Sequence, residues 1–319
     1  MVRYSQYLWK HKNYTSKITT FLSHKLEAET FRDGESEHIF FKEGIFQNRH
    51  VNKTKEPNGT YVCWEPSEEF FTHPEVNIKE IKNLFKTISC LCPGLTIELN
   101  NNGTIENFYS QNGLNDLVDQ LVQDKEIIDN RLSFNFSENK NKIDLVLTYT
   151  TNYSPNFVAY VNTGLTETGP HIVQIKTLLT REFNKFFRDK GWLKDKDENL
   201  SGDDIQEGLY LVFNITAPNV SYDAQVKSRV TKIDMKPFTN IISDKLHEWF
   251  EINEKEIKKI ADKAINARKA REAAKRARDA AREVNNNNKK KKIIKFDSKL
   301  ADCYSKKRSD CEIYITEGK

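Results

Sequence analysis

The feature that most constrains this chain is a stretch at residues 253–284 that contains neither glycine nor proline. Ala, Lys, Arg and Glu dominate it, and all four are strong helix formers. Asn253, followed three residues later by Glu256, has the form of a capping box, in which two side chains satisfy free amide donors at a helix start. At about 1.5 Å per residue, the stretch predicts a single helical rod of roughly 45 Å.

Two stripes run along this rod. One consists of small residues that step by three and four, namely Ala267, Ala270, Ala274, Ala277 and Ala281. The other is basic and keeps that spacing one residue further on, at Arg268, Arg271, Lys275, Arg278 and Arg282. Residues 264–284 hold seven basic and three acidic side chains, a net charge of about +4. The basic stripe predicts contacts with the phosphates of double-stranded DNA, and the alternative is a solvated helix whose charges only keep it in solution.

The composition is polar but still typical of a globular protein. The 319 residues are enough for two domains, with three small ones as the alternative. The mean hydropathy is −0.71, yet 19 Phe, 12 Tyr and 4 Trp supply anchors for a core. Because the net charge of the whole chain is only +4, any surface for nucleic acid must be local.

Membrane insertion and disulfide bonding are not expected. No apolar run approaches the length that spans a bilayer, and the N-terminus does not have the pattern of a signal peptide. The cysteines are odd in number and lack the C-x-x-C spacing of a zinc site, which indicates free thiols in a reducing cytoplasm. They are Cys63, Cys90, Cys92, Cys303 and Cys311.

The remaining pattern predicts strands interleaved with helices. Strands are expected at residues 27–31, 37–42, 60–64, 95–99, 132–136, 143–149, 157–162 and 210–216. Helices are expected at residues 78–92, 114–123, 172–190 and 237–250. A polar loop is expected at 51–59, and Ser201 should cap a short turn. Residues 285–292, NNNNKKKK, should form a mobile tether, with a nuclear-localisation or nucleic-acid patch as the alternative.

Residues 197–209, DENLSGDDIQEGL, resemble the transducer segment of one enzyme family, the ATPase (B) subunits of bacterial and phage type IIA DNA topoisomerases, gyrase and topoisomerase IV. The resemblance extends over about residues 17–318. Residues 172–193 are similar to the family helix before that segment, and residues 264–283 to its Ala/Arg-rich connector. Residues 25–34 and 59–64 resemble the end of the ATPase domain, and residues 299–318 the entry into the toprim domain.

This resemblance implies sites for ATP and Mg²⁺. Gln225 and Lys227 match a loop whose Gln and Lys reach the γ-phosphate of ATP. Thr60 matches the Thr that closes the nucleotide pocket beside the adenine. Glu317 matches the catalytic acid that opens the toprim metal site, which also needs a later Asp-x-Asp. Lys319 stands where the family places Asp, so we expect that metal site to be incomplete in this chain.

The chain also departs from the family pattern. The family's nucleotide-binding Glu, Asn and Asp should lie about a hundred residues before Lys17, so we expect a partial chain. Residues 13–17 contain no glycine where the family has a glycine-rich lid, and only glycine permits such close backbone approach to phosphate. Ala224 replaces a glycine that usually precedes the sensing Gln.

We therefore expect an α+β fold in sequential modules. Residues 1–107 should be the C-terminal remnant of a GHKL-type ATPase domain. Residues 108–243 should be a transducer domain like domain 2 of ribosomal protein S5, a four-stranded sheet backed by helices. Residues 244–295 should hold connector helices and the tether, and residues 296–319 the start of a toprim domain.

The predicted function is that of a segment of a type II topoisomerase ATPase subunit, coupling ATP binding and hydrolysis to DNA strand passage. The resemblance implies self-dimerisation, a cleavage-reunion (A-type) partner subunit and a cytoplasmic, nucleoid-associated location. We expect an ATP-hydrolysing enzyme by family that is not active as this chain alone. Two alternatives remain open: a piece of a split enzyme whose ATP pocket lies on a separate chain, and a non-catalytic DNA-binding or interaction relic. The residues present do not separate gyrase from topoisomerase IV or a phage enzyme.

Overall fold

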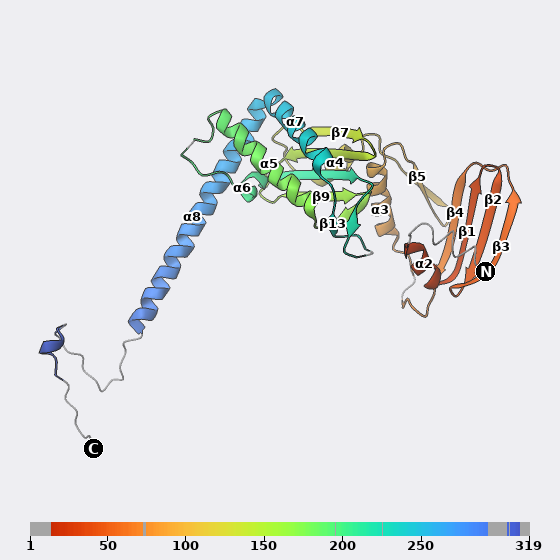
Figure 1. Ribbon diagram of the computed structural model, residues 1–319, viewed down its shortest axis with the longest axis horizontal. Coiled ribbons are helices and arrows are strands. Elements are labelled where there is room, and N and C mark those ends of the chain that lie inside the picture. Colours follow the sequence, from red (N-terminus) through yellow and green to blue (C-terminus); the bar gives the residue numbers. More distant parts are fainter. Residues whose placement is uncertain are drawn as a thin grey trace, which may run out of the picture.

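The computed structural model describes residues 14–72, 75–194, 196–224, 226–292, 305 and 307–312. Two units of mixed α/β structure follow each other along the chain, and a long helix projects from the second unit (Figure 1). The first unit is built on a four-stranded sheet and the second on a five-stranded sheet. The predicted mixture of helices and strands is therefore confirmed.

The first sheet is antiparallel and has the strand order β3-β2-β1-β4. Its strands are β1 (Ser23–Arg32), β2 (Glu35–Lys42), β3 (Ile45–Lys53) and β4 (Gly59–Pro66). Helix α2 (Tyr14–Phe21) leads directly into β1. Asp33 and Gly34 have φ angles of 54° and 85°, which the tight hairpin turn predicted at this dipeptide requires.

One strand of this sheet differs from the sequence prediction. The predicted loop at residues 51–59 is wrong for residues 51–53, which belong to β3. Every residue of β3 is exposed. With no buried face, the strand lacks the apolar alternation by which a half-buried strand is recognised.

A helix and a hairpin connect the two sheets. Helix α3 (Ile78–Leu91) matches the predicted helix at 78–92, and the side chain of Asn77 caps it by accepting a hydrogen bond from the Glu80 amide at 3.3 Å. The hairpin of β5 (Ile97–Asn101) and β6 (Thr104–Phe108) turns at Asn102 and Gly103, both with positive φ.

The second sheet has the strand order β10-β9-β11-β8-β7, in which β9 and β11 are parallel and the other neighbours antiparallel. Its strands are β7 (Leu132–Glu138), β8 (Asn141–Tyr149), β9 (Asn156–Val161), β10 (Gly164–Thr166) and β11 (Leu209–Thr216). The expected number of four strands is wrong because β10 adds a short fifth strand. The helices of this unit are α4 (Leu114–Val122), α5 (Pro170–Asp189), α6 (Gly202–Gln206) and α7 (Lys236–Ile252).

Helices cover both faces of the second sheet. On one face, the Phe183 ring of α5 lies 4.8–6.4 Å, between centroids, from the rings of Tyr149, Phe187, Trp249 and Phe250. On the other face, α4 and the end of α3 pack against residues such as Val146 and Val212. Strand β11 is consequently buried from Leu209 to Ile215, as its nearly continuous apolar sequence indicates.

The long helix α8 (Glu254–Lys292) begins where predicted, but its predicted capping box does not form. The side-chain NH₂ of Asn253 donates to the Trp249 carbonyl at the end of α7, at 2.9 Å. The side-chain oxygen of Asn253 accepts from Asn130, also at 2.9 Å. The Asn253 carboxamide therefore secures the junction between α7 and α8.

The predicted mobile tether is also wrong for the backbone, because α8 continues through residues 285–292 to Lys292. The predicted toprim start at 296–319 lies mostly outside the described residues. Within it, the structure describes 305 and 307–312, which include the short helix η1 (Arg308–Asp310).

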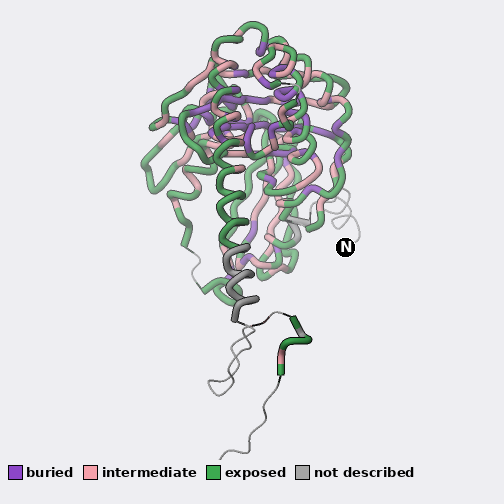
Figure 2. Tube along the Cα trace, turned by 90° about the vertical axis from the view of Figure 1, so that its left-hand side faces the viewer, coloured by how far each residue is buried: buried purple, intermediate pink, exposed green. Residues whose placement is uncertain are grey.

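Burial separates the parts of the chain. Buried residues concentrate in the second unit, whereas the first sheet and the projecting part of α8 are mostly exposed (Figure 2). Within residues 254–282, the part of α8 whose burial is described, the last buried residue is Ala267, and residues 273–282 are all exposed. Among the helices that the structure describes, none is both long enough and apolar enough to cross a membrane.

Candidate functional site

Thr60 lies on the apolar face of the first sheet. Directly opposed residues of antiparallel strands share a face, and the register places Thr60 opposite Thr30 and Thr30 opposite Glu37. Alternate residues of the same strands fall on this face too, and most are apolar: Leu26, Ala28, Ile39, Phe41, Val62 and Trp64. The sheet therefore presents one apolar face, with a threonine hydroxyl near the hairpin end.

The surface beside Thr60 is hollowed. The hollow has a volume of about 1000 Å³, and Thr30, Glu37, Arg49 and Thr60 are among its lining residues. Arg49 pairs with Glu37 at 2.9 Å. Hydroxyl, carboxylate and guanidinium groups together offer both donors and acceptors, as the edge of a heteroaromatic base requires. Sequence reasoning missed Arg49 because it lies on β3, the strand without an apolar alternation.

The apolar face is not covered by the described residues. Val51, Val62 and Trp64 share it, and their exposed fractions are 52%, 56% and 49%. Contiguous exposed apolar residues of this size mark a surface that binds another element.

Lys227 lies in the loop that joins β12 (Ser221–Tyr222) to β13 (Val230–Lys232). Its backbone amide donates to the Ala224 carbonyl at 3.1 Å, and its φ is 61°, a conformation that only surrounding structure sustains in a non-glycine residue. The turn leaves the Lys227 side chain exposed. Gln225 lies outside the described residues. The structure therefore places Lys227 and Thr60 on separate units and does not bring them into one pocket.

Backbone contacts tie this loop to the start of α5. The Glu167 amide donates to the Ser228 carbonyl at 2.8 Å, and the Val230 amide to the Thr168 carbonyl at 3.1 Å. Gly169, at the N-cap of α5, has a φ of 153°, and a Cβ there would lie 2.8 Å from the Val230 carbonyl oxygen. The contact leaves no room for a side chain, so the start of β13, where this loop ends, packs directly on the N-cap of α5.

His171, in that first turn, is fully buried and neutral. The Thr166 hydroxyl donates to the Ala159 carbonyl, so at 2.8 Å it accepts from the Nε2–H of His171. This assigns the tautomer and leaves Nδ1 as a buried acceptor without a partner among the described residues. Burial lowers the pKa of His171 to about 4, because it disfavours the charged imidazolium.

A basic groove follows α5. It has a volume of about 720 Å³ and runs between α5 and residues 199–206. Its charged lining residues, among those the structure describes, are all basic, namely Lys176, Arg181, Lys185 and Arg188. Thr177, Thr180, Asn199 and Gln206 add groups that form hydrogen bonds. Sequence reasoning missed the groove, although these basic residues recur at helical spacing opposite the apolar stripe of α5.

The basic stripe of α8 divides into two parts. Arg271 forms two hydrogen bonds with Asp204, Nε to Oδ1 at 2.9 Å and Nη2 to Oδ2 at 2.8 Å. Arg268 donates to the Glu198 carbonyl at 2.8 Å. Lys275, Arg278 and Arg282 lie further along the exposed part of the helix. The five residues thus do not form one uniform surface, because the first two contact the second unit.

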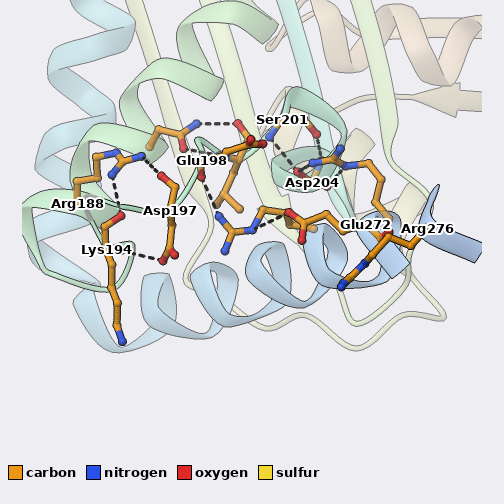
Figure 3. A network of polar contacts seen from close by, with 12 residues as sticks. Arg188, Lys194, Asp197, Glu198, Ser201, Asp204, Glu272 and Arg276 are labelled. Atoms are coloured by element: carbon orange, nitrogen blue, oxygen red, sulfur yellow. Dashed lines mark hydrogen bonds and ion pairs between the residues drawn. The ribbon is translucent and has the colours of Figure 1, made fainter. Parts of the chain in front are cut away.

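Residues 194–206, the strap, connect α5 with α8 through polar contacts (Figure 3). Ser201 caps α6 as predicted, and it forms a complete capping box with Asp204. Burial alone would raise the pKa of Asp204, but the hydrogen bonds from Arg271 and Ser201 hold that pKa below its ordinary value. Asp204 is therefore a carboxylate that Arg271 and the α6 cap share.

The predicted metal site is not tested by these contacts. Glu317 lies outside the described residues. Within the described part of the chain, no group of three or more His, Cys, Asp or Glu side chains is arranged to hold a metal ion.

The low pKa of His171 predicts an acid-dependent loss of stability. The unfolded chain takes up a proton near pH 6.5, whereas the folded chain resists it until about pH 4, so protonation favours unfolding in this window. We expect the unfolding free energy of the wild type, relative to His171→Phe, to fall by about 3 kcal/mol from pH 7.5 to pH 4.

Urea unfolding at several pH values measures this difference. The comparison with the variant is necessary because burial raises the pKa of Asp129 to about 6, which favours the folded state as pH falls. A wild type and a variant with parallel pH profiles would contradict the buried neutral imidazole.

Known proteins resemble this chain over most of its length. The family model for DNA gyrase B matches residues 113–280. The chain is 30% identical to the DNA gyrase B protein of Clostridium acetobutylicum over 326 residues, which covers 95% of this chain and 48% of that protein. It is 29% identical to the B-type chain of DNA topoisomerase 4 from Bacillus subtilis, covering 95% of this chain and 47% of that protein. The chain thus spans about half the length of these relatives.

Two solved structures share the fold. The 43K ATPase domain of Thermus thermophilus gyrase B, in complex with an aminocoumarin, aligns with a TM-score of 0.63 and 23% identity, covering 82% of this chain and 73% of that one. The topoisomerase IV ATP-binding domain of Francisella tularensis, in complex with a small-molecule inhibitor, aligns with a TM-score of 0.67 and 24% identity, covering 80% and 71%. The family match, which spans more than half of the chain, shows that this protein belongs to the DNA gyrase B family of type IIA topoisomerases.

Proposed function

We propose that this chain couples nucleotide state to DNA strand passage within a type II topoisomerase, with the second unit as the transducer. The observation that carries this proposal is the backbone connection between the end of the Lys227 loop and residues 167–168, which lead directly into α5. It links a candidate phosphate contact to the body from which α8 projects. The ATP-hydrolysing activity belongs to the assembled enzyme.

The nucleotide contacts follow from the chemistry of the candidate residues. The exposed ammonium of Lys227, together with Gln225, suits the γ-phosphate of ATP, and the Thr60 hydroxyl suits the edge of the base. ATP supplies the free energy of binding and hydrolysis. Because Thr60 and Lys227 belong to different units, one nucleotide that contacts both would draw the loop toward the first sheet. Mg²⁺ is also expected from the family at the separate toprim site, where Glu317 is the candidate ligand and the later Asp-x-Asp is missing from the sequence.

DNA would be held on two basic surfaces. The groove along α5 offers Lys176, Arg181 and Lys185, and the exposed part of α8 offers Lys275, Arg278 and Arg282. Both suit a phosphate backbone rather than a base sequence, because long basic side chains on a helix face carry no base-reading geometry. Arg268 and Arg271, which contact the second unit, are proposed to orient α8 rather than to lead the DNA contact.

The proposed partners complete the enzyme. A cleavage-reunion (A-type) subunit would cut the DNA, and a second copy of the ATPase subunit would close the gate through which a duplex passes. The role proposed for this chain is therefore to transmit the nucleotide-dependent movement, and not to cleave DNA.

The DNA surfaces can be tested separately. The logarithm of the DNA-binding constant falls linearly with the logarithm of the salt concentration. Replacing Lys275, Arg278 and Arg282 by Gln should make this slope shallower by up to about 3 for a short duplex, since each lost phosphate contact removes about 0.9. The triple variant Lys176→Gln, Arg181→Gln, Lys185→Gln should do the same. Fluorescence anisotropy at several salt concentrations measures the slope.

The matched control changes Lys42, Lys53 and Lys140 to Gln, three exposed lysines elsewhere on the chain. It should leave the slope unchanged. If both test variants also kept the wild-type slope, the proposed DNA surfaces would be excluded.

A second candidate is a split enzyme, and the uncovered face of the first sheet favours it. Val51, Val62 and Trp64 are about half exposed on this face, and the chain covers 73% and 71% of the two solved ATPase domains. We propose as occupant the N-terminal part of a GHKL ATPase domain, supplied as a separate polypeptide that carries the rest of the ATP pocket.

This cover can be tested by mixing the chain with the recombinant N-terminal half of the Clostridium acetobutylicum ATPase domain. We expect the two to co-elute in gel filtration, and the double variant Val62→Glu, Trp64→Glu to abolish co-elution. Tyr61→Ser with Cys63→Ser is the control, because alternate residues of β4 lie on the opposite face. Separate elution of the wild-type chain would remove the split-enzyme proposal.

A further inference from the structure

We propose that the strap, residues 194–206, fixes the direction in which α8 leaves the second unit, with Asp204 as its positioning residue. The inference itself does not need the proposed function. Only the purpose of that direction, to present the basic residues of α8 to DNA, rests on it. It combines an anchor on α5, a joint on α8 and the exposure of the helix beyond the joint.

The anchor is formed by two side chains of α5. Asn184 is buried, and its carboxamide holds both backbone groups of Leu200, accepting from the amide at 2.8 Å and donating to the carbonyl at 2.9 Å. Arg188 donates to the carbonyls of Lys194 and Asp197 at 2.9 and 2.8 Å. Because both side chains project from one helix, the strap must follow α5.

The joint is the pair of Asp204 and Arg271. The Asp204 side chain is 2% exposed, and it receives two hydrogen bonds from the guanidinium as well as one from the Ser201 amide at 2.9 Å. Two parallel bonds fix the angle between donor and acceptor as well as their distance. The same carboxylate belongs to the capping box of α6, so α6 cannot turn without moving Arg271.

A second contact adds a fixed point next to the joint. Arg268 donates to the Glu198 carbonyl of the strap at 2.8 Å, one helical turn before Arg271. The first turns of α8 are already held by buried residues such as Ile257 and Ala264, and these two contacts extend the hold by one to two turns.

The rest of α8 depends on this joint because nothing in the described chain supports it further out. Residues 273–282 are exposed, and the helix runs to Lys292. An arm of about 30 Å turns a rotation of about 10° at the joint into a displacement of about 5 Å at its end. Small movements of the strap are therefore amplified toward the end of the helix, by about 1–3 Å at Lys275, Arg278 and Arg282 and by more beyond them.

The test measures the distance between spin labels introduced as non-natural amino acids at Glu138, on the sheet, and Ala277, on the exposed helix. We expect a single narrow distribution in the wild type and a shifted, broader one in Arg271→Gln. Arg271→Lys, which keeps the charge but loses the paired bonds, should broaden it less. Arg278→Gln, in the exposed part of the same helix, is the control and should match the wild type.

Variants in the anchor on α5 test whether the whole strap, and not only the contact between Asp204 and Arg271, positions α8. Arg188→Gln and Asn184→Asp should both broaden the distribution, although their side chains contact only α5 and the strap. Circular dichroism of each variant verifies that it is folded, and Arg188→Gln, at a partly exposed position, serves if Asn184→Asp unfolds.

If folded Arg271→Gln kept the wild-type distance distribution, the proposal that the pair of Asp204 and Arg271 positions α8 would be overturned. If folded Arg188→Gln kept it, the proposal that the strap positions α8 would be overturned. The measurement contains neither nucleotide nor DNA. Its failure would therefore leave the DNA-binding result untouched, and failure of DNA binding would leave the strap in place.

Discussion

The packing of α5 against the five-stranded sheet is the interaction on which the rest of the structure depends. Phe183 and Phe187 bury their rings completely in this interface, each worth about 1.5–3 kcal/mol of transfer free energy. With its middle fixed in this way, the two ends of α5 can hold separate parts of the chain. The residues that lead into it, 167 and 168, hold the Lys227 loop, and its last turns hold the strap that contacts α8.

The two sheets differ in how far helices cover their faces. The second sheet has helices on both faces and a fully buried central strand, so its unit has its own core. The first sheet keeps Leu26 buried, but the outer strands of its apolar face are exposed. Such a sheet depends on a further element for much of its stability, because three or more strands need a buried apolar face. This difference separates a unit with its own core from a sheet whose apolar face is largely exposed among the described residues.

Much of this fold could be predicted from local pattern. The helix rule located α5 and α8 because one has an apolar stripe and the other no helix breaker, and Asp33-Gly34 located the first hairpin. The same rules failed at β3, which has no buried face, and at Asn253, whose amide finds partners 4 and 123 residues away in sequence. Local sequence does not encode such distant partners.

The candidate site was predictable only in part, for the same reason. The five residues of the basic stripe do lie on one helix, α8. However, Arg271 binds a carboxylate that lies 67 residues earlier in the chain, and helical spacing alone does not reveal this partner. The groove on α5 could have been found by examining the face of the helix opposite its apolar stripe. The tautomer of His171 could be assigned only from the hydrogen bond of Thr166 to Ala159, a contact between strands.

The central claim is that the loop, α5, the strap and the packed part of α8 form one cooperative body. Native-state hydrogen exchange on this chain tests it most directly. We expect the amides of α5, β11, α6 and the first turns of α8 up to Arg271 to share one opening free energy, while residues 273–282 and β1–β4 exchange more easily. If α8 before Arg271 opened independently of α5, the claim that α5 positions this helix would be contradicted.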